Sequence, residues 1–358
     1  MVRFVGASSV WRARPPSRIA RGSEVACQPG EHERSPTAHR VPALNLGSAV
    51  IVLTLALATA ARAEEPQPEA PTDQPWSLDL TVHDVGIGIG NSKHIDGLRL
   101  NFRDTAPFTV HGVNATIWSP SERGAGDVTG LALGIPVTGA GTLRGLGLGL
   151  GLAVSKEFDG VGVGILGLGS GGALRGIFVG GLGAGTGGDI DGLALGGVGV
   201  ACLGRLRGIA VAGLGVGCGE EVVGIAVGGL GVGAGGDLRG LSVAGLAVGA
   251  GGSIEGVAIA ALVGAPRIRG AVASLAAGGR DVAGLVVAPA YFDLMPDGKM
   301  TGVSVSAFNR IRGEQRGLAI GIVNYTPSLH GVQIGLVNWA GNNPSGLKLL
   351  PIVNAHLD

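Results

Sequence analysis

The residues of this chain that could do chemistry are few, and the first group is a glycine motif. Gly183, Gly185 and Gly188 form a Gly-x-Gly-x-x-Gly pattern, which in dinucleotide-binding proteins brings the backbone close to a phosphate. The pattern binds phosphate only where a helix follows and presents its N-terminus to the anion. The sequence predicts no helix here, so we expect no nucleotide site and no cofactor.

A second candidate is the acidic stretch GGDIDG at residues 187–192, which is similar to calcium-binding β-roll repeats. Those repeats have a nine-residue period, which this chain lacks. The residues that correspond to Asp189 in other repeats are Arg205, Glu221 and Ser253. Calcium prefers a set of oxygen ligands, and the arginine breaks any such set. We therefore expect no metal site.

The remaining ionisable residues show no pattern typical of catalysis. Glu220 and Glu221 are expected in a turn that faces solvent. β-Helical polysaccharide lyases and hydrolases need longer coils and a cluster of acidic and basic groups on one face, and no such cluster is visible. The histidines have no metal-ligand spacing; they are His83, His94, His111, His330 and His356. We expect no catalytic residue and no enzymatic activity.

The cysteines Cys202 and Cys218 lie sixteen residues apart, which is one full period of the repeat described below. Residues stacked on adjacent strands have Cα atoms about 4.8 Å apart, within the disulfide range of roughly 4.4 to 6.8 Å. In an oxidising compartment we predict a bridge between them. Two buried free thiols are the alternative.

Glycine organises the whole chain, since it supplies 70 of the 358 residues, while aromatic residues supply 4% and charged residues 15%. A glycine followed by an aliphatic residue recurs seventeen times, at spacings of 14 to 18 residues that include six consecutive spacings of 16. Self-similarity at a fixed period indicates stacked repeats. The repeat glycines are Gly97, Gly112, Gly130, Gly145, Gly160, Gly176, Gly192, Gly208, Gly224, Gly240, Gly256, Gly270, Gly284, Gly302, Gly317, Gly331 and Gly346.

Within each repeat, bulky aliphatic residues fall at positions +1, +3, +6, +8 and +14, counted from the repeat glycine. In the repeat of Gly208 they are Ile209, Val211, Leu214, Val216 and Val222. Spacings of two are typical of strands, and the change of phase between +3 and +6 predicts a corner. We expect these five positions to face inward and the Gly, Ala or Ser residues at +2, +4, +7 and +9 to face outward.

These patterns predict an all-β chain that folds as a parallel β-solenoid of about 15 to 17 short coils, in which each coil stacks on the one before. We expect the repeat glycine to adopt a positive φ or to leave no room for a Cβ atom. The alternative is an antiparallel outer-membrane β-barrel with one strand per repeat. Missing aromatic girdles and a C-terminal aspartate oppose that alternative.

Two polar columns follow from the stacking. The residue before the repeat glycine alternates in charge between coils, as stacked neighbours of like charge would repel. Near the C-terminus the asparagines recur at spacings of 15, 14 and 16, which predicts an amide ladder. The charged residues are Arg144, Asp159, Arg175, Asp191 and Arg207, and the asparagines are Asn309, Asn324, Asn338 and Asn354.

The N-terminal part indicates export. Residues 1–63 carry eight Arg and three Glu, and the apolar segment 49–61 ends in Ala61-Arg62-Ala63. An apolar run of this length before small residues at −3 and −1 is typical of a secretory signal and its cleavage site. About 40 residues precede the run, and a mis-called start codon would explain that length.

The rest of the chain divides into a tether and a repeat domain. Residues 64–76 are acidic and Pro-rich, which is typical of a flexible tether. Residues 77–358 form the repeat domain, with an aromatic N-terminal cap over about 77–118 and a Pro-bearing C-terminal cap over about 340–358. Caps are expected because the terminal coils of a solenoid are exposed strand edges.

The expected outer faces of Gly and Ala are smooth and uncharged, which suggests that they contact something. We expect an envelope protein, a membrane surface or a second copy of the chain as the partner. The chain after residue 63 has 18 basic and 23 acidic residues and no basic stripe, so nucleic acid is not expected. The longer repeat of Gly284 adds a candidate interaction loop with Tyr291, Phe292, Asp293 and Asp297.

The C-terminal repeats RGLAIGIVNYTPSLHGVQIGLVNWAGNNPSGLKLLPIVNAHLD resemble a family of bacterial surface-repeat proteins, whose units read Gly-hydrophobic-x-Ile-Gly-hydrophobic-Val-Asn. The resemblance is best over residues 300–358. It implies an exported surface protein with no assigned activity and transfers no site residue. From sequence we therefore expect a structural or interaction protein at the cell surface or outer membrane, with the periplasm as another possible location.

Overall fold

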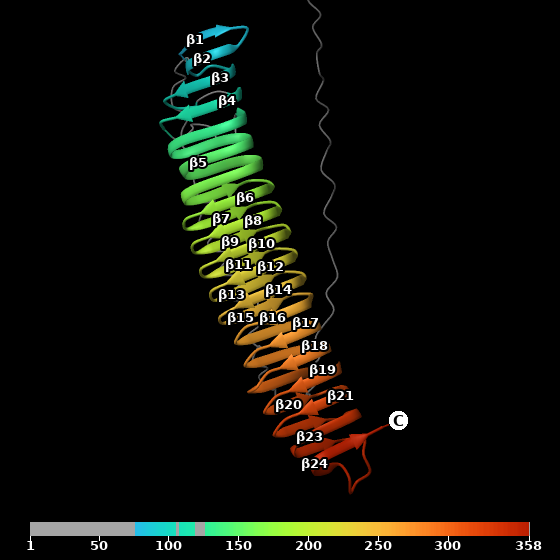
Figure 1. Ribbon diagram of the computed structural model, residues 1–358. Helices are drawn as coiled ribbons and strands as arrows, with labels where there is room; N and C mark the ends of the chain where they lie inside the picture. Colours follow the sequence, from blue (N-terminus) through green and yellow to red (C-terminus); the bar gives the residue numbers. More distant parts are fainter. Residues whose placement is uncertain (1–75, 105–106, 119–125, 358) are drawn as a thin grey trace, which may run out of the picture. The chain divides into compact units, whose positions relative to one another are not determined.

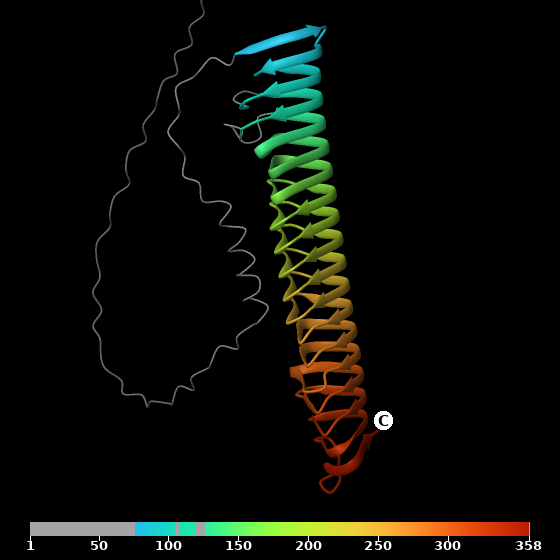
Figure 2. The same cartoon turned by 60° about the vertical axis from the view of Figure 1, so that its left-hand side comes forward.

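The computed structural model describes residues 76–104, 107–118 and 126–357. They form a parallel β-solenoid of about 15 coils with a period of about 16 residues, stacked along one axis (Figures 1 and 2). The predicted solenoid is confirmed, and among these residues antiparallel pairing is confined to the two ends of the stack. The predicted signal region, and the tether except for Trp76, lie outside the described residues.

Each central coil contains one long and one short strand. The long strand β10 (Leu206–Ala212) is followed by a bend, and the short strand β11 (Gly215–Cys218) leads into the polar turn before the next coil. β10 pairs in parallel with the long strands of the neighbouring coils, β8 (Ile190–Gly196) and β12 (Val222–Gly228). The corner predicted from the change of phase is this bend at positions +5 and +6.

The other strands follow the same scheme, and several continue from one sheet around into the next. From the N-terminus they are β1 (Ser77–Val82), β2 (Val85–Gly90), β3 (His94–Asn101), β4 (Phe108–Thr116), β5 (Gly126–Ser170), β6 (Leu174–Gly180), β7 (Gly183–Thr186) and β9 (Gly199–Cys202). In the second half they are β13 (Gly231–Ala234), β14 (Leu238–Ala244), β15 (Ala247–Ala250), β16 (Ser253–Ile259), β17 (Leu262–Ala273), β18 (Ala276–Val287), β19 (Tyr291–Val305), β20 (Phe308–Ile311), β21 (Glu314–Ile320), β22 (Val323–Thr326), β23 (Ser328–Ala340) and β24 (Leu349–His356).

The repeat glycines form a column through the long strands. Gly208 has a φ of 124°, and a Cβ atom there would lie 2.1 Å from the carbonyl oxygen of Gly192 in the preceding coil. Only glycine fits a backbone with this φ and this approach. Sixteen of the seventeen predicted repeat glycines have a positive φ. The exception, Gly346, lies between β23 and β24, beyond the last parallel coil.

The interior differs from the prediction in which positions it buries. Positions +8 and +14 are buried as predicted, for example Val216 and Val222. Positions +1, +3 and +6 face outward, and the small residues at +2 and +4 face inward. In the coil of Gly208, Ala210 and Ala212 are therefore buried, while Ile209, Val211 and Leu214 are exposed.

The reason for this reversal is the alternation of the long strand. Side chains alternate with period two, and the strand runs through the repeat glycine without a change of phase. Position +14, two residues before the next repeat glycine, therefore shares its side with +2 and +4. The space between the sheets is narrow at the corner, because a Cβ atom on Gly196 or Gly228 at +4 would lie 2.1 Å from the carbonyl oxygen of Gly199 or Gly231.

Both ends of the stack turn back on themselves. β1 pairs antiparallel with β2, and β24 pairs antiparallel with β23. The first coils bury Arg99, whose guanidinium binds Asp104 and Asn114 and lies 4.1 Å from the centre of the Phe108 ring. The last coils bury the amide ladder, in which Asn309 donates to Asn324 and Asn324 to Asn338, each over 2.7 Å. Asn354 instead donates to the Asn338 carbonyl oxygen, over 3.3 Å.

Candidate interaction surfaces

The long strands present two outward columns of aliphatic side chains, which we call the outer aliphatic face. These columns are the residues at positions +1 and +3 of every coil, in register from Ile87 and Ile89 to Val332 and Ile334. All are Ile, Leu or Val except Ala115, Ala271 and Ala273. The central members are Ile177, Leu193, Ile209, Ile225, Leu241 and Val257 in one column and Val179, Leu195, Val211, Val227, Val243 and Ile259 in the other.

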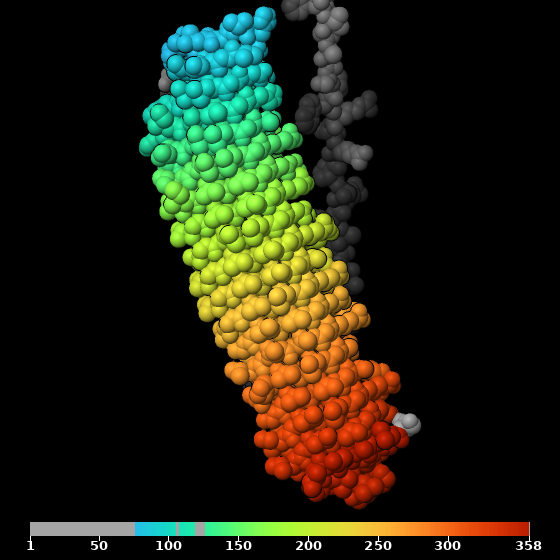
Figure 3. Space-filling view, viewed as in Figure 1, coloured from blue at the N-terminus to red at the C-terminus, as the bar shows by residue number. Residues whose placement is uncertain are grey.

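None of these central side chains is buried: half of them are exposed and the other half are half-buried. Ile177 is 45% exposed, Ile209 41% and Val211 38%. Seventeen rungs at about 4.8 Å and a width of about 10 Å give a face of about 800 Å². Monomeric soluble proteins rarely expose an apolar patch of more than a few hundred Å². The successive coils make parallel bands along the stack (Figure 3).

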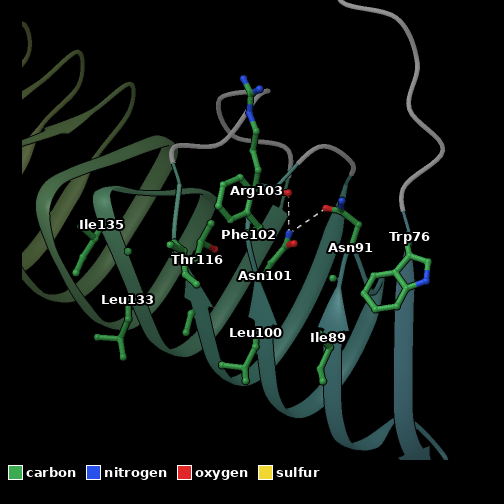
Figure 4. Close-up of a pocket in the computed structure, with 14 residues that line it drawn as sticks. Trp76, Ile89, Asn91, Leu100, Asn101, Phe102, Arg103, Thr116, Leu133 and Ile135 are labelled. Carbon is green, nitrogen blue, oxygen red and sulfur yellow. Dashed lines mark hydrogen bonds between the residues drawn. The ribbon is translucent and has the colours of Figure 1, made fainter.

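A corner column extends this apolar surface. It contains position +6 of the central coils, where Leu182 is 60% exposed and Leu230 52%. At the N-terminal end the same side of the solenoid has an open hollow of about 1,030 Å³, lined mainly by apolar residues. Ile89, Leu100 and Leu133, which belong to the +3 column of the outer aliphatic face, line this hollow, and their side chains point away from the ribbon on the same side of the solenoid (Figure 4). The hollow is therefore continuous with the outer aliphatic face.

The charged column lies beside the outer aliphatic face on the same side of the same strands. Asp159, Arg175, Asp191 and Arg207 stack directly on one another, as predicted. Arg175 lies 3.3 Å from Glu157 and 3.4 Å from Asp159, and these two carboxylates raise the pKa of Arg175.

The charged column continues further along the stack. Its later members include Arg239, Glu255 and Arg269. Arg239 contacts Glu221 at 2.6 Å and Glu255 at 3.3 Å, and Arg269 contacts Glu255 at 3.6 Å. The outer aliphatic face is thus bordered by charges that alternate on each side of Val223, which interrupts the column between Arg207 and Arg239.

The short strands carry a second outer face of small residues. At positions +7 and +9, Gly199 and Ala201 alternate outward on β9, and Gly215 and Gly217 do so on β11. A Cβ atom on Gly199 would lie 3.7 Å from its nearest neighbour, which is ordinary contact. The smooth face predicted at these positions therefore exists on the short strands, but the prediction was wrong for positions +2 and +4, which are interior.

Toward the C-terminus the short-strand face becomes aromatic. Tyr291 stacks on Phe308 with ring centres 5.7 Å apart, and Tyr325 stacks on Trp339 at 4.5 Å. Arg310 lies in register between Asp293 and Tyr325. A hydrogen bond with Tyr291 is the main cause that raises the pKa of the Arg310 guanidinium. These rings stack mainly on one another, which is what a column of aromatics on adjacent parallel strands does.

The candidate interaction loop is dispersed by the fold. Tyr291 and Asp293 lie on the short-strand face, and Asp293 is bound by Arg312 at 2.7 Å. Phe292 is fully buried, because it points inward between these two neighbours. Asp297 is exposed within β19, where the pairing with β18 is irregular, and has a φ of 58°. The four residues therefore form no single site.

Cys202 and Cys218 are joined by a disulfide, with Cα atoms 4.6 Å apart on the paired strands β9 and β11.

In the part of the chain that the structure describes, no three His, Cys, Asp or Glu side chains converge to hold a metal ion. Among residues 76–104, 107–118 and 126–357 there is no helix of the length and apolarity that a membrane crossing requires.

Comparison of the chain with family models, with curated proteins and with solved structures finds no match. The resemblance of the C-terminal repeats to bacterial surface-repeat proteins therefore stays a prediction.

Sequence reasoning missed the outer aliphatic face, although one signal could have found it. The strand alternation that places Val222 inside requires Ile209 and Val211 to lie outside.

Proposed function

We propose that this protein is an exported structural or interaction module of the cell envelope, which works through its outer aliphatic face and not through catalysis. The observation that carries the proposal is that face, because about 800 Å² of mainly Ile, Leu and Val in register is more than an isolated soluble protein usually exposes in one patch. A rigid solenoid keeps these side chains in fixed columns, so a partner meets one continuous surface.

Two further observations support export. The apolar segment 49–61 and the Ala61-Arg62-Ala63 sequence after it are typical of a signal and its cleavage site. The disulfide between Cys202 and Cys218 is of a kind that persists in oxidising compartments. Together they favour the periplasm, the outer membrane or the cell surface as the place of action.

The proposal is tested by expressing the full chain with a C-terminal tag in a bacterium with two membranes and fractionating the cells. We expect the tag in the envelope fraction, an N-terminus at Glu64, and release by urea or high salt without detergent. Ala61→Glu with Ala63→Glu should block cleavage, while the control Ala70→Glu should be processed normally. A tagged chain that stays cytoplasmic, with Cys27, Cys202 and Cys218 all alkylatable without reductant, would contradict the proposal.

A further inference from the structure

We propose that the outer aliphatic face binds the same face of a second copy of this chain, with the two solenoids antiparallel. This inference names the partner of the proposed interaction module and rests on the proposed role of that face. The first argument is area, because about 800 Å² from each copy gives about 1,600 Å², the size of a standard stable protein interface.

The second argument is shape. Two β-sheets pack face to face about 10 Å apart when their facing side chains interdigitate. The outer aliphatic face repeats the same two aliphatic columns at every coil, as Ile209 and Val211 show over Ile225 and Val227. A surface with this repeat matches itself along its whole length, because its rungs have the same spacing in both copies and each rung of one copy can lie opposite a rung of the other.

The third argument is the charged column, which fixes the direction. A two-fold axis parallel to the strands makes the solenoids antiparallel and sets the charged column of one copy against that of the other. With the axis between the coils of Asp191 and Arg207, these two residues face each other across the interface, and Asp159 faces Arg239. Arg144 then faces Glu255, so the alternation observed within one chain becomes opposite-sign pairing between chains.

The register is restricted by the same column. Moving the axis by one full coil spacing, to between Arg207 and Val223, again gives opposite signs, with Asp191 against Arg239. An axis through a coil is disfavoured, because it sets Arg207 against itself and Arg175 against Arg239. Like charges in contact are strongly disfavoured at an interface. Both favoured registers overlap sixteen of the seventeen rungs.

A second copy fits this surface better than a lipid bilayer does. Arg175 and Asp191 point to the same side as the aliphatic columns and lie about 7 Å from the first of them, which is one alternation of a strand. Inserting the aliphatic columns into hydrocarbon would also remove the Arg and Asp side chains of the charged column from water, and burying unpaired ions is costly. In contact with a second copy, the same Arg and Asp side chains lie opposite residues of the other sign.

The test is sedimentation velocity on the purified full chain, with Ile209→Glu combined with Val211→Glu as the disrupting variant. Ala201→Glu on the short-strand face is the matched control, and circular dichroism checks that each variant keeps its strands. We expect a dimer for the unmodified chain and for Ala201→Glu at micromolar concentration. The double variant should raise the dissociation constant at least about tenfold, since it places charges in the apolar centre.

Asp191→Arg provides an independent test of direction, because Asp191 faces an arginine in both favoured registers. We expect it to weaken the dimer about tenfold or more at low salt, and the loss should shrink at high salt. Adding Arg207→Asp to Asp191→Arg should restore much of the affinity, because residues 191 and 207 then have opposite signs again in the first register, in which Asp159 still faces Arg239. No effect of Asp191→Arg at low salt would overturn the antiparallel arrangement.

The remaining outcomes are equally decisive. A monomer at tens of micromolar concentration would overturn the dimer, and so would a dimer disrupted by Ala201→Glu but not by Ile209→Glu with Val211→Glu. A monomer that binds phosphatidylglycerol vesicles through the outer aliphatic face would make lipid the occupant and leave the proposed envelope function standing. The fractionation above tests that function without reference to the dimer, so the two can fail separately.

Discussion

Ala210 and Val211 are neighbours on β10 and point to opposite sides of the sheet, the alanine into the interior and the valine to the outside. Ala210 is fully buried, whereas Val211 is 38% exposed. The smaller side chain occupies the core because the interior is narrow. The larger side chain is placed where it can contact a partner. The same relationship recurs at Ala226 and Val227 in the next coil.

Enlarging the interior residue should therefore be more harmful than changing the outer one. We expect Ala210→Leu to lower the free energy of unfolding by about 1 to 3 kcal/mol, because extra methylenes in a packed core force strain. Val211→Thr keeps the shape and should change it by about 0.5 kcal/mol or less. Urea unfolding at low protein concentration compares the two. A larger loss for Val211→Thr would mean that the sides of β10 are assigned wrongly.

The sequence predicted the coil much better than it predicted the orientation of its side chains. The spacing of the repeat glycines gives the period of the coil. Glycine is required at these positions because the φ is positive and because a Cβ atom, for example on Gly208, would clash with the backbone of Gly192. Stacking then sets the register of Cys202 on Cys218 without further information. These features depend on backbone geometry alone, which the glycine pattern reports directly.

The inside and outside of the coil could not be read from residue size. Large aliphatic residues usually mark the core, and Ile209 and Leu214 break that rule because both lie outside. The interior has room for larger side chains only locally. Phe158 and Phe178 lie edge to face with ring centres 5.0 Å apart, where a Cβ atom on Gly162 would lie 2.5 Å from Phe158. A large side chain such as Phe158 fits only because a nearby glycine leaves space for it, and such pairing depends on the tertiary structure.

The repeat glycines and the surface glycines should respond in opposite ways to the same substitution. Gly208→Ala combines a φ of 124° with a contact of 2.1 Å, so we expect it to cost about 3 kcal/mol or more. Gly199→Ala meets nothing closer than 3.7 Å and should be neutral or stabilise by about 0.5 kcal/mol, since it restricts the unfolded chain. Guanidinium unfolding curves for the two variants check this, and similar losses would count against the glycine column.

Removing the disulfide should destabilise the fold through the unfolded state. Cys202 and Cys218 close a loop of sixteen residues, and a loop of that length is worth about 3 kcal/mol. The double variant Cys202→Ala with Cys218→Ala is well matched, because Ala234 and Ala250 occupy the same column in the next coils. Guanidinium unfolding of this variant should agree with that of the reduced unmodified chain. Unfolding midpoints that do not differ with and without reductant would contradict the prediction.

Asp237 should make the stability depend on pH. Its carboxylate accepts hydrogen bonds from the Ser253 hydroxyl at 2.9 Å and the Ser253 backbone N–H at 2.7 Å, and the hydroxyl bond is the main cause that lowers the pKa of Asp237. A lowered folded-state pKa gives stability that is present above the unfolded-state pKa, about 4, and is lost as the pH falls through the folded-state value.

Asp237→Asn should therefore cost about 1 kcal/mol at pH 7, and progressively less as the pH falls below about 4. Asp297→Asn is the matched control, because Asp297 is exposed and its φ of 58° suits asparagine equally well. Thermal unfolding of both variants from pH 2 to pH 7 measures the difference. A cost for Asp237→Asn that is the same at every pH would show that the charge of the carboxylate contributes nothing.

The amide ladder should tolerate an apolar replacement worse than the surface does. Asn324 accepts from Asn309 and donates to Asn338 and to the Ile334 carbonyl oxygen. Asn324→Leu therefore removes the donor to these two acceptors and one of the acceptors of the Asn309 amide, which keeps its bond to Ile320. We expect a loss of about 2 to 4 kcal/mol, because each orphaned group keeps its full desolvation cost. The size of leucine is not the obstacle, since Phe292 occupies the same column one coil before Asn309.

Asn342→Leu is the control. Asn342 is exposed and bonds backbone groups of Leu329 that water can reach. Its loss of unfolding free energy should stay below about 1.5 kcal/mol in the same urea titration. Equal losses at the two positions would mean that the ladder adds nothing beyond ordinary surface hydrogen bonds.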